Sequence, residues 1–156
     1  MKDDWATPQS LFDKIDAEFH FRLDACASPE NAKCACFYTR EQDSLSNYWH
    51  SEPVRSVWVN PPYGKEIGLW IKKAMETAAM GDTVVCLVPT RTNAPWWHDY
   101  VMKAAEIRFI RKKVSFVGDK NGVAFTGHAL VVFRPGHYEL KCSSWDQPIK
   151  EKKVVA

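Results

Sequence analysis

A strand that ends at a double proline constrains this chain more than any other feature. Residues 57–59 form an apolar run, and Asn60-Pro61-Pro62-Tyr63 follows directly. Each proline fixes φ and lacks a backbone N–H donor, and the first proline disfavours the helical region for Asn60. The chain therefore leaves the strand in a stiff turn. That turn holds the Asn60 side chain, the Pro61 carbonyl and the Tyr63 ring in defined positions.

The surrounding sequence alternates between strand and helix patterns. Apolar spacing predicts helices over residues 10–19, 67–80 and 95–105, and strands over residues 21–23, 36–39, 57–59, 83–88, 106–110, 114–117 and 129–133. Thr7 is expected to cap the first helix, and Pro8 fits its first turn. The last two strands are expected to pair as a hairpin. Strands that alternate with helices favour an α/β sheet, here with an antiparallel C-terminal edge hairpin.

Length and hydropathy limit the organisation of the chain. A chain of 156 residues suits one domain, predicted over residues 1–140, with a charged C-terminal tail over residues 141–156. No apolar run approaches the roughly 20 residues of a membrane span. The first residues lack the apolar core of a signal peptide. We therefore expect a cytoplasmic protein without membrane contact.

The cysteines do not form a recognisable metal-binding pattern. The spacing of Cys26, Cys34 and Cys36 differs from that of common zinc sites, and no fourth ligand lies at a standard distance. An odd total of five cysteines without an export signal disfavours disulfides. Cys86 lies in an apolar strand and is expected in the core. No metal is predicted.

Charge is distributed unevenly along the chain. Residues 101–156 hold eleven Lys/Arg against five Asp/Glu. A basic third suits contact with a phosphate backbone, and Arg111, Lys112 and Lys113 flank an apolar strand. A solvated face followed by a charged tail explains the same counts. Both interpretations are consistent with the sequence.

The chemistry of the double-proline turn suggests a substrate. An exocyclic amino group donates two hydrogen bonds, which the Asn60 oxygen and the Pro61 carbonyl would accept while Tyr63 stacks on the base. The tetrapeptide matches the catalytic motif of amino-methyltransferases. These enzymes transfer a methyl group from S-adenosylmethionine to adenine N6, cytosine N4 or a glutamine amide. The residues do not choose among these amino groups, and a Pro-Pro pair can also simply end a strand.

Further segments support a closer resemblance when they are taken in chain order. They are Trp5-Ala6-Thr7-Pro8, Asp24-Ala25-Cys26-Ala27, Asp43-Ser44-Leu45 followed by Asn60-Pro61-Pro62-Tyr63, and Val88-Pro89-Thr90-Arg91-Thr92-Asn93. Together they resemble the small phage-type DNA adenine-N6 methyltransferases from about residue 5 to residue 135. The resemblance implies a Rossmann-like S-adenosylmethionine-dependent methyltransferase sheet.

The resemblance also implies which residues bind the cofactor. Trp5, Thr7 and Pro8 would close over its methionine end, and small residues after Asp24, namely Ala25 and Cys26, would let the backbone approach it. Asp43 and Leu45 would border the adenosine, with Glu41 as a competitor of Asp43. Asn60 would contact cofactor and substrate alike. The glycines of the common methyltransferase loop are absent, and Asp24 can also be a turn former.

Double-stranded DNA is the partner that the resemblance implies. The target base would be flipped out of the duplex, and Arg91, Asn93 and the basic residues 111–113 would contact DNA. No segment is long enough for a separate target-recognition domain, so specificity is expected to be limited or supplied by a second subunit. The alternatives are an RNA or protein-glutamine N-methyltransferase, or a non-catalytic DNA-binding module. The target sequence and the oligomeric state remain open.

Overall fold

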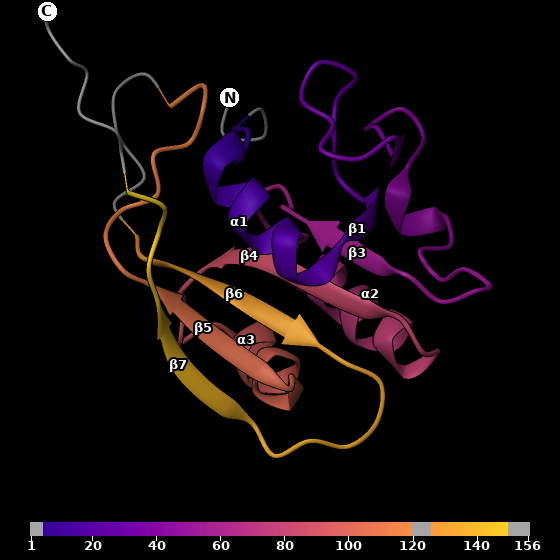
Figure 1. The fold of residues 1–156 in the computed structure, drawn as a ribbon. Coiled ribbons are helices and arrows are strands. Elements are labelled where there is room, and N and C mark those ends of the chain that lie inside the picture. Colours follow the sequence, from indigo (N-terminus) through magenta and orange to yellow (C-terminus); the bar gives the residue numbers. More distant parts are fainter. Residues whose placement is uncertain (1–4, 120–125, 150–156) are drawn as a thin grey trace, which may run out of the picture.

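One twisted sheet of seven strands, in the order β2-β1-β3-β4-β6-β5-β7, runs through the computed structural model, which describes residues 5–119 and 126–149 (Figure 1). Every strand pair is parallel except the two pairs made by β6. The strands are β1 (Phe21–Asp24), β2 (Cys36–Phe37), β3 (Ser56–Val59), β4 (Thr83–Pro89), β5 (Glu106–Ile110), β6 (His128–Phe133) and β7 (Lys141–Trp145).

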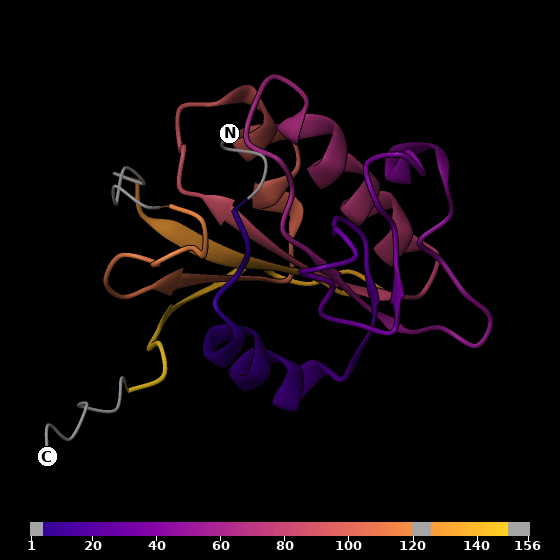
Figure 2. The same cartoon turned by 90° about the horizontal axis from the view of Figure 1, so that it is seen from above.

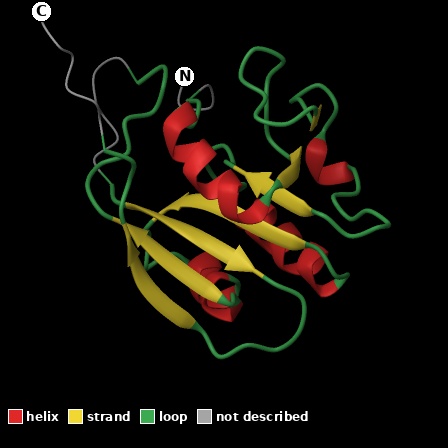
Figure 3. Ribbon diagram, viewed as in Figure 1, coloured by secondary structure: helices red, strands yellow, loops and turns green. Residues whose placement is uncertain are grey.

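Helices cover both faces of the sheet. They are α1 (Gln9–Phe19), α2 (Ile67–Ala79) and α3 (Pro95–Asp99), with short 3₁₀ turns at η2 (Ser44–Ser46) and η3 (Val101–Lys103). Figure 2 shows α1 on one side of the sheet and α2 and α3 on the other. Because both faces are covered, the central strands are apolar throughout, as the buried run of β4 and β6 illustrates. The same arrangement of layers can be followed in Figure 3.

Each helical layer has its own core. On one face, Leu11, Phe12 and Ile15 of α1 pack on a cluster that includes Trp58. On the other face, the apolar stripe of α2 packs against the opposite side chains of β1, β3, β4 and β6. Cys86 belongs to this second core and is fully buried, which confirms its predicted place. The two cores hold the strand ends rigidly, and this rigidity determines where the site residues lie.

The predicted start of the first helix needs one correction. The N-cap position of α1 is Pro8, and no side chain caps it. Thr7 instead faces the end of β3, where its hydroxyl accepts a hydrogen bond from Asn60. The local sequence favours a capping threonine, but a long-range partner takes the hydroxyl. The predicted third helix also ends early, because it divides into α3 and η3.

The predicted C-terminal hairpin is wrong in its pairing. Strand β6 lies between β4 and β5 and is antiparallel to both, so the antiparallel strand is internal rather than at the edge. Residues 114–117 form no strand, and Val117 makes only an isolated bridge with Ala6. Strand β6 is buried on both faces, and the sheet interior satisfies its backbone groups on both sides. Val114 and Phe116 are nevertheless buried, because their side chains pack in the core on the α1 side of the sheet.

The sheet extends into the segment predicted as a charged tail. Strand β7 runs parallel to β5 and forms the edge of the sheet. Its residues are mostly exposed, so the sequence has no apolar pattern there that would predict a strand. Lys14 lies over the Trp145 ring at 4.6 Å and attaches this edge to α1. Residues 150–156 of the predicted tail lie outside the described residues, and the division of the chain at residue 140 remains a prediction.

Neither a membrane span nor a metal cluster is found in the described chain. Within residues 5–119 and 126–149, no helix combines the length and apolar character needed to cross a bilayer. The same residues contain no group of three or more His, Cys, Asp or Glu side chains placed to hold a metal ion.

Candidate active site

The site lies at the carboxyl edge of the sheet, where β1, β3 and β4 end and β6 begins. A pocket of about 690 Å³ opens there, a size that suits a cofactor. It is lined by the N-terminal segment, the loop after β1, the η2 turn and the turn after β3. Ten predicted site residues line it: Trp5, Thr7, Asp24, Ala25, Cys26, Asp43, Leu45, Asn60, Pro62 and Tyr63.

Three residues considered for cofactor binding or catalysis do not line this pocket. Pro8 is partly buried at the start of α1, and Pro61 is buried beneath the turn. Glu41 is exposed and also lies outside the lining. Because Asp43 lines the pocket, the geometry favours Asp43 over Glu41 as the acidic residue of this site.

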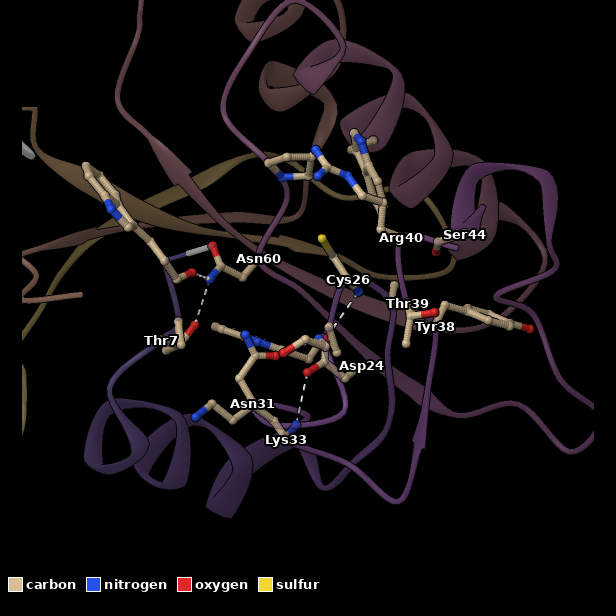
Figure 4. A pocket seen from close by; sticks show the side chains of 18 of the residues that line it. Thr7, Asp24, Cys26, Asn31, Lys33, Tyr38, Thr39, Arg40, Ser44 and Asn60 are labelled. Carbon is tan, nitrogen blue, oxygen red and sulfur yellow. Dashed lines mark hydrogen bonds between the residues drawn. The ribbon is translucent and has the colours of Figure 1, made fainter. Parts of the chain in front are cut away.

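Asn60 is held by the N-terminal segment. Its amide nitrogen donates to the Thr7 hydroxyl at 3.1 Å and to the Trp5 carbonyl at 3.3 Å (Figure 4). Both acceptors come from a part of the chain remote in sequence. The remaining polar atom of the side chain, Oδ1, can therefore accept a hydrogen bond from a donor group in the pocket.

Tyr63 is enclosed by aromatic rings. Trp5 and Phe116 meet its ring edge-on, with centroids 6.4 Å and 6.2 Å away, and His128 stacks on it at 5.8 Å. Its hydroxyl is buried and has no hydrogen-bond partner within the described chain. Burial raises the pKa of Tyr63 and lowers the pKa of His128 to about 4, so both groups are neutral near pH 7.

Asp24 organises the loop that follows β1. Its carboxylate accepts the backbone N–H of Cys26 at 3.2 Å and that of Lys33 at 3.0 Å (Figure 4). The side chain is almost fully buried, and burial raises its pKa to about 6 although these N–H donors and the Lys33 charge oppose the shift. Asp24 is thus both a turn former and a pocket carboxylate. The two readings of the sequence are compatible.

The η2 turn forms another wall of the pocket. Asp43 takes a left-handed backbone conformation, and its carboxylate accepts the Ser46 hydroxyl at 2.7 Å. Lys73 of α2 donates to the Leu45 carbonyl at 2.8 Å and fixes the turn to the helix. Behind it, the Trp70 indole N–H lies buried in the lining without a hydrogen-bond partner in the described residues. A ligand with polar and apolar parts suits this wall.

The predicted DNA-binding residues occupy two exposed places outside the pocket. Arg91 and Asn93 follow β4 at the same sheet edge, and the charge of Arg91 acts on the Tyr63 phenol. In α3, which follows these residues, Trp97 is buried, and the His98 ring donates to the Thr92 carbonyl at 2.7 Å.

The second exposed place is the basic turn after β5, formed by Arg111, Lys112 and Lys113. The Gln147 amide donates to all three backbone carbonyls of this turn. Lys112 takes a positive φ of 66°. The contact with Gln147 holds the turn in a defined shape while its side chains remain exposed.

Sequence reasoning missed several residues of the site. Lys33 lines the pocket, and Phe116 and His128 enclose Tyr63. No local pattern marks them, because their proximity depends on strand order. The one available signal was the place of His128 at the start of a buried strand, which is an unusual position for a polar residue.

A parallel α/β sheet with one inserted antiparallel strand, and with its pocket beyond the carboxyl ends, is consistent with a methyltransferase-like fold. The chain matches the family described as DNA N-6-adenine-methyltransferase (Dam) over residues 1–147. It belongs to this family.

Two phage proteins show the similarity directly. The chain is 32% identical over 124 residues to a DNA N-6-adenine-methyltransferase of Haemophilus phage HP1 (strain HP1c1), covering 78% of this chain and 70% of that protein. It is 30% identical over 128 residues to a DNA N-6-adenine-methyltransferase of Escherichia phage T1, covering 81% of this chain. The chain spans about half of the length of the phage T1 relative, at 52%.

Proposed function

We propose that this protein transfers a methyl group from S-adenosylmethionine to adenine N6 in double-stranded DNA. The observation that carries the proposal is the orientation of Asn60 at the carboxyl edge of the sheet. Its amide nitrogen is bound to Trp5 and Thr7, so its oxygen faces the substrate as an acceptor. Membership of the adenine-methyltransferase family favours adenine N6 over cytosine N4, which the same acceptor would also fit.

The pocket has features that fit S-adenosylmethionine. Two carboxylates, of Asp24 and Asp43, suit its positive charge and its hydroxyl groups, and Leu45 offers an apolar contact. The buried Trp70 N–H can donate to a ligand acceptor. When bound, the cofactor supplies an electrophilic methyl group on sulfur.

The residues of the chain act mainly by positioning. The Asn60 oxygen and the Pro61 carbonyl would accept hydrogen bonds from the adenine amino group, drawing its nitrogen toward tetrahedral geometry and freeing the lone pair for attack on the methyl carbon. Tyr63 would stack on the flipped base, which offsets the few kcal/mol lost on unstacking. The surplus proton passes to water after transfer, so no strong general base is needed. Catalysis of this kind rests on alignment and fixed dipoles.

DNA would lie across the exposed residues at the same edge. Arg91 and Asn93 follow β4, and the turn at Arg111, Lys112 and Lys113 adds a compact cluster of positive charge. Such groups bind phosphates and set the register of the duplex. A DNA substrate and phage relatives favour action in the cytoplasm of an infected bacterium.

A substrate panel tests this function. Purified protein is incubated with labelled S-adenosylmethionine in three parallel reactions, which contain unmethylated duplex DNA, RNA or a protein extract. We expect label in duplex DNA alone. Label in RNA or protein instead would favour the corresponding N-methyltransferase, and cofactor binding without any transfer would leave the substrate unidentified. Absence of cofactor binding would overturn the proposal in favour of a DNA-binding module.

A further inference from the structure

We propose that residues 5–7 form a strap that fixes the amide of Asn60, with Thr7 as the positioning residue. The inference rests on the proposed methyltransferase function and assigns to Thr7 a role beyond contact with the cofactor. Thr7 acts through Asn60, whose oxygen meets the substrate. The strap selects which face of the amide that substrate encounters.

The strap is anchored independently of any ligand. Ala6 and Val117 exchange two backbone hydrogen bonds, of 3.0 Å and 2.9 Å. The Trp5 ring stacks on Phe116 with centroids 5.8 Å apart and planes at 25°. Thr7 is 2% exposed, so its hydroxyl is held inside the protein. These contacts set the Trp5 carbonyl and the Thr7 hydroxyl before a substrate arrives.

The donor and acceptor pattern determines the amide orientation. An asparagine side chain has two N–H donors and one acceptor oxygen, and a backbone carbonyl can only accept. The Trp5 carbonyl lies 3.3 Å from Nδ2 of Asn60. Turning the amide over would place Oδ1 against that carbonyl and lose this hydrogen bond, whereas the Thr7 hydroxyl could then donate to Oδ1. The Trp5 carbonyl thus selects the orientation, and the Thr7 hydroxyl holds the amide beside it. The strap therefore satisfies both N–H groups and leaves the oxygen for the pocket.

This orientation matches one class of substrate. An amino group is a donor and needs an acceptor, whereas a reversed amide would present N–H groups to it. Without the Thr7 hydroxyl one of the two hydrogen bonds that hold the amide in place is lost, so the productive position of its oxygen is populated less. Because a neutral hydrogen bond contributes about 0.5–1.5 kcal/mol, its loss should slow methyl transfer roughly 2- to 13-fold.

The first test measures single-turnover transfer at saturating DNA and S-adenosylmethionine. Thr7→Val keeps the shape and removes the hydroxyl, so we expect the slower rate even at cofactor concentrations that calorimetry shows to be saturating for the variant. Thr7→Ser restores the hydroxyl and should restore the rate. Thr77→Val is the matched control, because Thr77 is also buried but its hydroxyl donates to the Lys73 backbone carbonyl within α2 and not to Asn60. Its rate should equal that of the wild type.

A second readout needs no activity. The side-chain NH₂ resonances of Asn60, assigned by their loss in Asn60→Asp, should shift in Thr7→Val and return in Thr7→Ser. The inference would be overturned if Thr7→Val transferred the methyl group at the wild-type rate, including the case in which only its cofactor Kd changes. It would also be overturned if Thr7→Ser did not restore the rate. If the wild type methylates nothing, the proposed function fails, and unchanged Asn60 resonances in Thr7→Val would separately refute the strap.

Discussion

The ring of Tyr63 stacks on the imidazole of His128, with centroids 5.8 Å apart and planes at 29°. Phe116 meets both rings, edge-on to Tyr63 and at 5.0 Å from His128. The turn after β3 is therefore braced by a residue of β6, the strand inserted antiparallel beside β4. Because β6 lies inside the sheet, His128 is held in place and in turn supports the ring of Tyr63, the proposed base-stacking residue.

The first prediction concerns the ring and the hydroxyl of Tyr63. Because the hydroxyl is buried without a partner in the described chain, Tyr63→Phe should keep activity and leave the free energy of unfolding unchanged or slightly higher. Tyr63→Ala removes a stacking surface worth about 1–3 kcal/mol per base, so kcat/KM for DNA should fall about 5- to 160-fold. Steady-state kinetics and thermal melts measure both effects. Equal loss of activity in the two variants would assign the hydroxyl a direct role and contradict this account.

The second prediction concerns pH and cofactor binding. Burial raises the pKa of Asp24 to about 6, so its carboxylate gains charge as the pH rises through that value. S-adenosylmethionine carries a net positive charge, and its affinity should increase from about pH 5 to about pH 7 and then level off. Calorimetric titrations across this range measure it. The free energy of unfolding changes in the opposite direction with pH. The pKa of Asp24 in the folded protein lies above its ordinary value of 3.8, so folding favours the protonated form. The contribution of Asp24 to stability is therefore full below about pH 3.8 and is lost as the pH rises through about 6.

Asp24→Asn is the control for this titration. The amide cannot ionise, so the variant should bind the cofactor more weakly near pH 7 and show little pH dependence over the same range. A pH profile identical to that of the wild type would assign the titration to another group.

The third prediction concerns DNA binding. Arg91 is exposed beside the Tyr63 turn, and a contact with one phosphate contributes about 0.9 to the slope of log affinity against log salt. Arg91→Ala should weaken DNA binding and reduce the magnitude of that slope by about this amount. Arg22→Ala is the matched control, since Arg22 is exposed at the opposite end of the strands. Equal slopes for wild type and Arg91→Ala, measured by fluorescence anisotropy, would remove Arg91 from the phosphate contacts.

The sequence predicts most elements of the fold but not their arrangement. Strands β1, β3, β4 and β5 lie where apolar patterns indicate, because burial imposes those patterns directly. Partner choice is a long-range property, and the prediction paired β6 with residues 114–117 instead of with β5 and β4. Strand β7 has an exposed, polar edge and carries no periodic signal.

In the candidate site too, the sequence predicts local features but not contacts between distant segments. Ten of the predicted residues line the pocket, because motifs at strand ends report local backbone geometry. The role of Thr7 toward Asn60 and the packing of Phe116 and His128 on Tyr63 depend on contacts between distant segments. A single sequence gives no record of such contacts.

The central claim is that Asn60 presents its oxygen to an adenine amino group. The most direct measurement is the nucleoside composition of unmethylated duplex DNA after incubation with labelled S-adenosylmethionine and either wild type or Asn60→Ala, both first shown to bind the cofactor. The account predicts labelled N6-methyladenine from the wild type and at least an approximately 100-fold lower yield from the variant, as expected when a preorganised polar contact in the transition state is lost. Labelled N4-methylcytosine, or equal yields from the two proteins, would contradict it.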